Sequence, residues 1–328
     1  MFETKLKIRR WWSNIKLRKN RETTAHQVRD KSLFSLVTWT FLKVAVLTLF
    51  AAIILFPFFY MITISFMPKH QADLLNSEFS FWPRYWDKSN YSDAISSGNG
   101  QGSGYWFAFG LTLANVVFSI AAKIFVTMLC GYAFSLKKWR GKEFVWGLFM
   151  SLLVLPEVAL LFGQFKVVAT IDNKTEILNS FIGAISMIAL PFVASIFNAL
   201  MFRNAFEAIP GRIKEVAMVD GCVGGKYLFK IAIPMVQPTT LTIIILTTLA
   251  SWNSYLWPSL LFASKRYEIM SVWLFNVGRV ELDGTTKVLQ SVKMAGAVLV
   301  ILPMFIFYFL FRRRIMNAIS RQGSAIKG

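Results

Sequence analysis

Residues 44–66 read VAVLTLFAAIILFPFFYMITISF, a run of 23 residues without a charged side chain. About 20 predominantly apolar residues form a helix long enough to cross the roughly 30 Å hydrocarbon core of a bilayer. Five more stretches of the chain are long and apolar enough for the same role. The six predicted spans are Trp39–Phe66, Phe107–Leu136, Phe144–Phe165, Ile177–Met201, Thr239–Phe262 and Ala295–Phe311. The sequence therefore predicts an all-α, polytopic membrane protein with six transmembrane helices.

The composition of the 328-residue chain also argues against a soluble domain. Hydrophobic residues make up 55% of the chain and charged residues only 16%, whereas soluble domains are about 25% charged. The two cysteines, Cys130 and Cys222, cannot staple a fold of this size, and two histidines are too few for a histidine-based site. We therefore expect no metal site and no histidine-based catalytic site.

The distribution of charge along the chain orients the spans. With the N-terminus in the cytoplasm, the inside segments carry 25 Lys and Arg and seven acids, whereas the outside segments carry nine of each. Cytoplasmic loops are enriched in Lys and Arg, so both termini are predicted to be cytoplasmic. Because the basic residues lie at the ends of spans instead of gathering on one folded face, the net charge of +19 does not indicate nucleic-acid binding.

Residues 1–38 form a basic segment ahead of the first span. This segment is too long and too charged for the n-region of a cleaved signal, so we expect the first span to be retained. Within it, Ile8, Trp11, Trp12 and Ile15 have the spacing of an apolar stripe on a helix and are surrounded by cations. Two interpretations remain open: an amphipathic helix on the anionic membrane lipid of the inner leaflet, or a solvated basic tail.

The cytoplasmic loop 202–237 is too polar to cross the bilayer, and its pattern predicts two short helices joined by a turn. Pro210 suits the start of the first helix, because its missing N–H would be unpaired there in any case. We expect Ile213, Val216 and Ala217 to share one face of that helix. An apolar stripe below the membrane indicates a protein partner.

The second half of this loop begins at a turn. Gly221 suits a position with a positive φ angle, and we expect Asp220 to cap the second helix by accepting from the N–H groups beyond the turn. Pro234 and Pro238 are then expected to break the chain before the fifth span.

The same loop carries a spaced sequence pattern. Glu215-x-Ala217-x-x-x-Gly221 is followed by nine residues and then by Ile231-x-Ile233-Pro234. This pattern resembles the signature loop of the permeases of binding-protein-dependent ABC importers, which reads Glu-Ala-Ala, three residues, Gly, nine residues and Ile-x-Leu-Pro. The five identities are Glu215, Ala217, Gly221, Ile231 and Pro234, and the two conservative replacements are Val216 and Ile233.

The resemblance implies a type I ABC importer permease bundle over residues 39–328, in which loop 202–237 couples to a dimer of separate ATPase subunits. The sequence contains no Gly-x-x-x-x-Gly-Lys-[Ser/Thr] phosphate loop, so a non-catalytic subunit is expected, with ATP and Mg bound only in the ATPase. A second related permease, an extracytoplasmic solute-binding protein and residence in the bacterial cytoplasmic (inner) membrane are implied as well. The expected coupling residues are Glu215, Val216, Ala217, Asp220, Gly221, Ile231 and Pro234.

Three shorter segments, 131–134, 252–258 and 323–328, resemble the carbohydrate-uptake branch of this family and imply import of oligosaccharides or polysaccharide fragments. A glycerol-phosphate or polyol permease, an ion-coupled secondary transporter and a non-transporting scaffold are the alternatives. Sugars are bound by aromatic faces and hydrogen-bonding side chains, whereas aromatic residues near a span end also form interfacial belts. The candidates for lining the substrate passage are Trp252, Asn253 and Tyr255.

Two charged residues, Lys123 and Glu157, fall inside predicted spans at similar distances from the tight inside loop near residue 140. Antiparallel neighbouring spans would hold both at about the same depth, where an isolated charge is costly. We expect a structural ion pair or charges that face a cavity; the rival hypothesis is that Lys123 attracts an acidic substrate.

Overall fold

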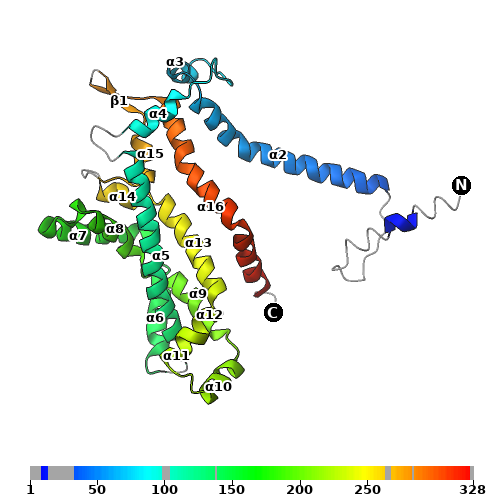
Figure 1. Cartoon of the computed structure of the whole chain (residues 1–328), viewed down its shortest axis with the longest axis vertical. Coiled ribbons are helices and arrows are strands. Elements are labelled where there is room, and N and C mark those ends of the chain that lie inside the picture. The colour runs from blue at the N-terminus through cyan, green and yellow to red at the C-terminus, as the bar shows by residue number, and fades with distance from the viewer. Residues whose placement is uncertain are drawn as a thin grey trace. The chain divides into compact units, whose positions relative to one another are not determined.

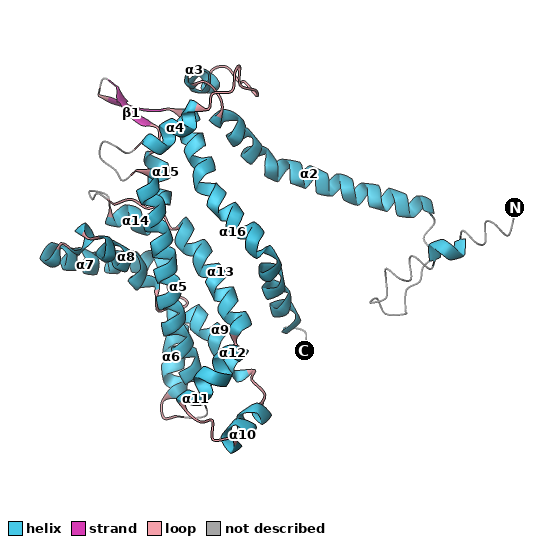
Figure 2. Ribbon diagram, in the orientation of Figure 1, coloured by secondary structure: helices cyan, strands magenta, loops and turns pink. Residues whose placement is uncertain are grey.

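The computed structural model describes residues 9–13, 33–97, 104–136, 139–262, 267–282 and 284–325. Helices dominate this part of the chain, and one two-stranded sheet accompanies them (Figure 1, Figure 2). The chain divides into two compact units, Met1–Phe59 and Tyr60–Gly328.

The first unit contains most of helix α2, Leu33–Ser65. The apolar side chains of α2 between Val37 and Phe59 are exposed, as expected for a helix surrounded by lipid. Of the basic segment, residues 9–13 form a helical turn in which the rings of Trp11 and Trp12 meet edge to face, with centroids 5.7 Å apart. Ile8 and Ile15 lie outside the described residues, so the apolar stripe of this segment stays a prediction.

Helix α5 is the central helix of the second unit. It runs from Tyr105 to Ser135 and packs against α8 (Phe181–Ala189), α9 (Ile196–Glu207) and α13 (Gln237–Asn253) (Figure 1). Gly131 allows α5 to approach α9 closely. A Cβ atom added there would lie 2.5 Å from Cβ of Phe202 and 2.8 Å from the carbonyl oxygen of Ala199, so only a glycine fits this crossing without a shift of the backbone.

The fourth predicted span is bent. Its two parts, Phe181–Phe192 and Ile196–Glu207, meet at 64°. The break follows the 3-10 turn η3 (Leu190–Phe192), and α9 then restarts at Ser195, whose hydroxyl accepts from the backbone N–H of Asn198. A serine N-cap of this kind satisfies one of the unpaired donors at a helix start.

The third predicted span, residues 144–165, is divided between α6 (Lys142–Leu152) and α7 (Glu157–Thr175), with Pro156 at the N-cap of α7 and the turn η2 (Ile177–Asn179) following it. Proline has no N–H and restricts the residue before it, which explains the break. Among the described helices, α2, α5 and α16 (Gln290–Ala325) are unbroken candidate spans, and two bent pairs raise the number to five. The all-α, polytopic class is confirmed.

Short elements lie beside the N-terminal ends of α5 and α16. They are α3 (Lys69–Asp73), η1 (Leu74–Asn76), α4 (Ser89–Ser96), α15 (Met270–Asn276) and the strands β1 (Arg279–Leu282) and β2 (Thr285–Val288). The antiparallel hairpin, with Arg279 opposite Val288, was not predicted from the sequence. Lys287 on this hairpin forms a 2.8 Å ion pair with Asp73 and so connects it to α3.

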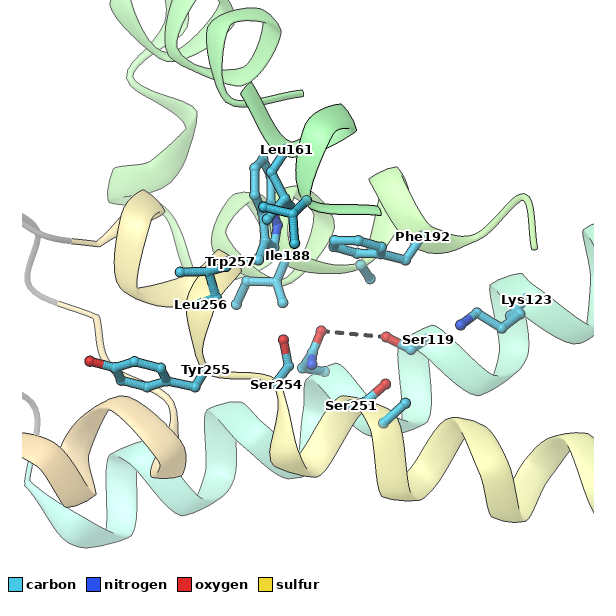
Figure 3. Close-up of a pocket in the computed structure, with 14 residues that line it drawn as sticks. Ser119, Lys123, Leu161, Ile188, Phe192, Ser251, Ser254, Tyr255, Leu256 and Trp257 are labelled. Carbon is cyan, nitrogen blue, oxygen red and sulfur yellow. Dashed lines mark hydrogen bonds between the residues drawn. The ribbon is translucent and has the colours of Figure 1, made fainter. Parts of the chain in front are cut away.

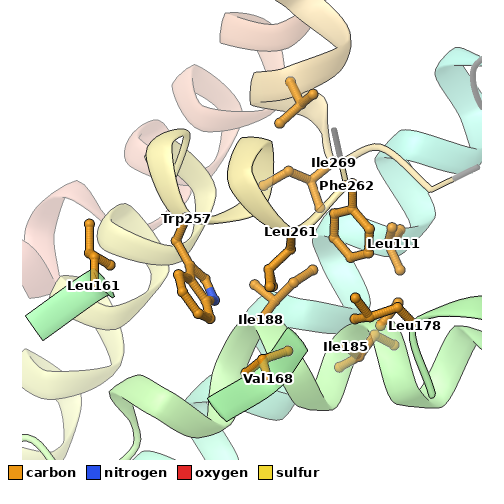
Figure 4. Close-up of a cluster of buried hydrophobic side chains, with 12 residues drawn as sticks. Leu111, Leu161, Val168, Leu178, Ile185, Ile188, Trp257, Leu261, Phe262 and Ile269 are labelled. Carbon is orange, nitrogen blue, oxygen red and sulfur yellow. The ribbon is translucent and has the colours of Figure 1, made fainter. Parts of the chain in front are cut away.

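A buried apolar cluster connects α5, α7, α8 and α14 (Leu256–Leu261) (Figure 4). Trp257 is its largest side chain, and its indole Nε1 donates a 3.2 Å hydrogen bond to the carbonyl oxygen of Met187. Leu161 of α7 and Ile188 of α8 pack in the same cluster. These three side chains also form one wall of a cavity, which positions the candidate site.

Candidate functional site

The loop between α9 and α13 folds into short helical elements (Figure 1). They are α10 (Gly211–Val219), α11 (Gly225–Tyr227), the π-helical turn η4 (Leu228–Ala232) and α12 (Ile233–Met235). We call residues 210–235 the coupling segment. The predicted arrangement of two short helices joined by a turn is confirmed.

The inner face of α10 holds the coupling segment against the bundle. Ala217 is 3% exposed and belongs to a buried cluster with Phe206 of α9 and Tyr227 of α11. Ile213 packs partly buried against the same cluster, whereas Val216 is 61% exposed. The prediction of one shared face for a partner is therefore wrong, because Ala217 and Ile213 pack against the chain itself and only Val216 faces outward. Neighbouring helix positions are about 100° apart, so a face that buries Ala217 turns Val216 outward.

The turn after α10 is a Schellman motif. Gly221 has φ +65°, its N–H donates to the carbonyl oxygen of Met218 (3.1 Å), and the N–H of Cys222 donates to that of Ala217 (2.7 Å). The expected positive φ at Gly221 is confirmed, because this motif requires a left-handed residue at that position. Asp220 is the C-cap residue of α10. The prediction that Asp220 caps the second helix is wrong, because the N-cap residue of that helix is Gly224.

Gly224 occupies the N-cap position of the second helix, α11, with φ 60° and ψ −131°. This backbone conformation is open to glycine and strained for other residues. The second helix therefore starts at Gly225, five residues after Asp220, beyond the reach assumed for an N-terminal cap.

The outer face of the coupling segment is apolar and exposed. Val219 is 88% exposed, and Val216, Met218 and Val223 are each more than half exposed. Glu215 and Asp220 are exposed beside them. Single exposed apolar residues are common, but a contiguous group on a segment that is itself firmly packed indicates an interaction surface.

The coupling segment joins α13 through a sharp bend. Gly225–Met235 and Gln237–Asn253 meet at 69°, with Pro234 and Pro238 on either side of the break, as predicted. A proline cannot donate the next helical hydrogen bond, and the π-helical turn that precedes Pro234 is one way for a helix to adapt. Ile231 on that turn packs partly buried against the cluster of Phe206 and Tyr227.

A cavity of about 330 Å³ lies among α5, α7, α8, α13 and α14. Its polar lining comes from Asn115 and Ser119 of α5 and from Ser251 and Ser254 beside the α13–α14 break (Figure 3). Phe192 and Trp257, together with Leu161 and Ile188, form its apolar lining. Aromatic faces next to hydroxyl and amide groups are the combination that suits a polyhydroxylated ligand.

Only one of the three predicted passage residues lines this cavity. Tyr255 does so, and its ring packs on Phe275 with centroids 4.2 Å apart. Trp252 is buried and meets Phe109 edge to face. Asn253 is exposed, and its amide donates a 2.9 Å hydrogen bond to the carbonyl oxygen of Leu249. Ser251 and Ser254, on either side of Asn253 in the sequence, line the cavity instead.

A polar stripe on α5 supplies lining residues that the sequence prediction did not include. Asn115, Ser119 and Lys123 recur every four residues and therefore share one face of the helix. Such a stripe on an otherwise apolar span is a mark of a surface that faces protein or a cavity and not lipid. All three residues line the cavity, so their spacing is the sequence signal that could have found them.

The structure describes only one of the two charged side chains that were predicted inside the membrane, Lys123 and Glu157. Lys123 of α5 lines the cavity. Glu157 begins α7, next to Val158, which lines the same cavity, but the side chain of Glu157 lies outside the described residues. The expectation of a Lys123–Glu157 pair, or of charges facing the cavity, stays a prediction.

A bent-helix membrane bundle with a cavity between its helices and an exposed apolar segment at one end defines a membrane transport subunit. The family described as "Binding-protein-dependent transport system inner membrane component" matches residues 123–321. The chain belongs to this family. The matched region includes the coupling segment and most of the cavity lining.

Individual relatives agree with this assignment. The chain is 40% identical over 304 residues to the "probable ABC transporter permease protein" of Mycoplasma genitalium, covering 92% of this chain and 93% of the relative. It is 24% identical to the arabinooligosaccharides transport system permease protein of Bacillus subtilis, over 84% and 91% of the two chains. A chain of a bacterial ABC transporter that imports the acidic polysaccharide alginate has the same fold, with a TM-score of 0.69 and 20% identity over 87% of this chain and 99% of that one.

Proposed function

We propose that this chain is the permease subunit of an ATP-driven importer of oligosaccharides or polysaccharide fragments. The exposed valine face of the coupling segment carries the proposal, because a firmly packed segment with an apolar outer surface can transmit the movement of a partner to the bundle. Relatives named for arabinooligosaccharides and for starch degradation products, the latter in Thermoanaerobacterium thermosulfurigenes, support the substrate class.

In this mechanism the chain performs no covalent chemistry. A dimer of ATPase subunits binds ATP and Mg, and its closure pushes on Val216, Val219 and the adjacent Glu215. Since Ala217 and Ile213 fix α10 to the cluster around Phe206 of α9, the push moves α9 with the segment. The bent helices then move so that the cavity is open to one side of the membrane or to the other in turn.

The cavity around Ser251 and Trp257 is the proposed substrate passage. Its hydroxyl and amide groups, on Asn115, Ser119 and Ser254, can exchange hydrogen bonds with sugar hydroxyls while the aromatic rings contact the apolar faces of the sugar ring. Its volume of about 330 Å³ is at the lower end of the range for ligand sites, roughly 300–1,000 Å³. An oligosaccharide would therefore pass through it a few units at a time.

Further partners complete the proposed assembly. A second related permease supplies the other half of the pathway, and an extracytoplasmic solute-binding protein docks on the outer loops 67–106 and 263–290. The excess of Lys and Arg on one side of the spans supports cytoplasmic N- and C-termini in a bacterial inner membrane.

Affinity purification of the full chain from membranes tests the proposal. An ATPase subunit and a second permease should co-purify. The reconstituted complex should then show ATPase stimulation by solute-binding protein loaded with an oligosaccharide, in a panel that includes polyols and glycerol phosphate. Stimulation by glycerol phosphate alone would favour the polyol alternative, and recovery of the chain without any ATPase would contradict the proposal.

A further inference from the structure

The second half of the coupling segment lies nearly parallel to the membrane plane. Residues Gly225–Met235, which we call the entry helix, lead into the span α13, and the two axes meet at 69° (Figure 1). The entry helix is about 16 Å long, so with α13 along the membrane normal it approaches the span by only about 6 Å in depth. The headgroup layer on each side of the hydrocarbon core is about 5–7 Å thick. The whole entry helix therefore fits within that layer.

The entry helix has one buried face and one exposed face. Leu228 and Ala232 are buried in the apolar cluster that also includes residues of α9. Lys226, Phe229 and Lys230 are exposed, and the ring of Phe229 is 68% exposed. Neither lysine forms an ion pair with a residue that the structure describes. Because positions i, i+3 and i+4 are neighbours on a helix, the exposed face presents an aromatic ring with a cation on either side.

The charge of this face differs from that of the outer face of α10. No aspartate or glutamate occurs between Gly221 and Asn253, whereas both acids of the coupling segment, Glu215 and Asp220, lie beside the exposed valines of α10. The phosphate groups of a membrane surface attract lysine and repel carboxylates. The exposed face of the entry helix therefore suits an anionic membrane surface, and the outer face of α10 does not.

We propose that Lys226, Phe229 and Lys230 bind an anionic phospholipid of the adjoining leaflet. The ring of Phe229 enters the boundary between the headgroups and the acyl chains, and the two ammonium groups contact phosphate oxygens, as in amphipathic helices that lie in a membrane interface. Because the entry helix runs directly into α13, this lipid contact fixes the depth at which the span begins. The inference needs only the depth and the charge of the entry helix, so it does not rest on the proposed transport function.

Photocrosslinking from the exposed ring tests the proposal. Phe229 of the full chain is replaced by p-benzoylphenylalanine, and the chain is reconstituted in nanodiscs of phosphatidylcholine with a minor fraction of phosphatidylglycerol. After irradiation, mass spectrometry identifies the crosslinked lipid by its mass. We expect phosphatidylglycerol to exceed its fraction in the nanodisc about tenfold among the adducts. Lys226→Gln and Lys230→Gln should each lower this enrichment about fivefold, which is the effect of one cation near an anionic surface.

Two controls separate this contact from general attraction and from a protein contact. Arg212→Gln removes an exposed cation of α10 and should leave the enrichment unchanged. The same photoreactive side chain in place of Val219 should give few lipid adducts, because α10 carries the acidic and apolar face. An absence of lipid adducts at position 229, adducts in proportion to the nanodisc composition, or an equal effect of Arg212→Gln would each overturn the proposal.

The co-purified complex provides the last comparison. Crosslinks from position 229 to an ATPase subunit, in place of lipid, would overturn the lipid site and leave the proposed function standing. Enriched phosphatidylglycerol adducts at position 229 in a chain that brings down no ATPase would support the lipid site while the proposed function fails.

Discussion

At the scale of single residues, Gly221 decides the geometry of the coupling segment. It ends α10 with φ +65° and directs the chain so that Cys222 and Ala217 close the Schellman motif. A residue with a Cβ atom pays about 1–2 kcal/mol in this conformation, and asparagine is the side chain that tolerates it best. The family motif therefore has a glycine here for a backbone reason.

Substitutions at Gly221 test this explanation. Gly221→Val should lower the unfolding temperature and weaken ATPase stimulation, because the branched side chain disfavours the left-handed conformation. Gly221→Asn should retain most of both. Nothing lies within 4 Å of a Cβ atom added at this position, so a steric clash cannot explain a difference. An equal loss of unfolding temperature and of ATPase stimulation in the two variants would contradict this explanation. It would show that the glycine is needed for a contact and not for its backbone conformation.

At the scale of helices, the close contact between α5 and α9 depends on Gly131, which has no side chain. Gly131→Ala should destabilise the fold by about 1–3 kcal/mol, as overpacking does, since the new Cβ would press on Phe202 and on the backbone of Ala199. Gly110→Ala on the same helix meets nothing within 4 Å and should be neutral or slightly stabilising. Thermal unfolding in detergent measures both, and similar curves for the two variants would contradict close packing at Gly131.

A substitution on the outer face of α10 should affect binding of a partner and leave the stability of the fold unchanged. Val219→Glu should change the free energy of unfolding by less than about 0.5 kcal/mol, because the side chain is exposed. It should nevertheless abolish co-purification of the ATPase, since a charge would enter an apolar contact. Val280→Glu, on the exposed hairpin of β1 and β2, serves as the control. Retention of the ATPase by Val219→Glu would place the contact elsewhere.

At the scale of the whole molecule, the cavity brings together side chains from helices that are distant in sequence. Lys123 of α5 lies on its wall, and α7 begins at Glu157, next to the lining residue Val158. If the two charges form a pair, then removing one leaves the other costly in a region of low dielectric constant.

A double-mutant cycle measures this coupling. Lys123→Met and Glu157→Gln should each lower the unfolding temperature and transport, and the double variant should be less damaged than the sum of the single variants. Additive losses would exclude the pair. In that case, a selective loss of acidic glycans from the transported panel in Lys123→Met would instead support attraction of an acidic substrate.

The sequence by itself determined the class of this protein and the form of its coupling segment. Membrane spans follow from the match between apolar length and bilayer thickness, which is a local property of the chain. The turn at Gly221 and the break at Pro234 are likewise local, because glycine and proline act on their own backbone. The break at Pro156 was not predicted, since residues 144–165 were expected to form one unbroken span.

Only the tertiary structure decided which residues line the cavity. Trp252 and Asn253 suit a sugar by their chemistry, yet the break after them directs Ser254 and Trp257 inward. The polar stripe from Asn115 to Lys123 is visible in the sequence, but its orientation depends on how α5 packs against α8, α9 and α13. The sequence determines the chemistry of each side chain. The direction in which a side chain points depends on how its helix packs against helices that lie tens of residues away in the sequence.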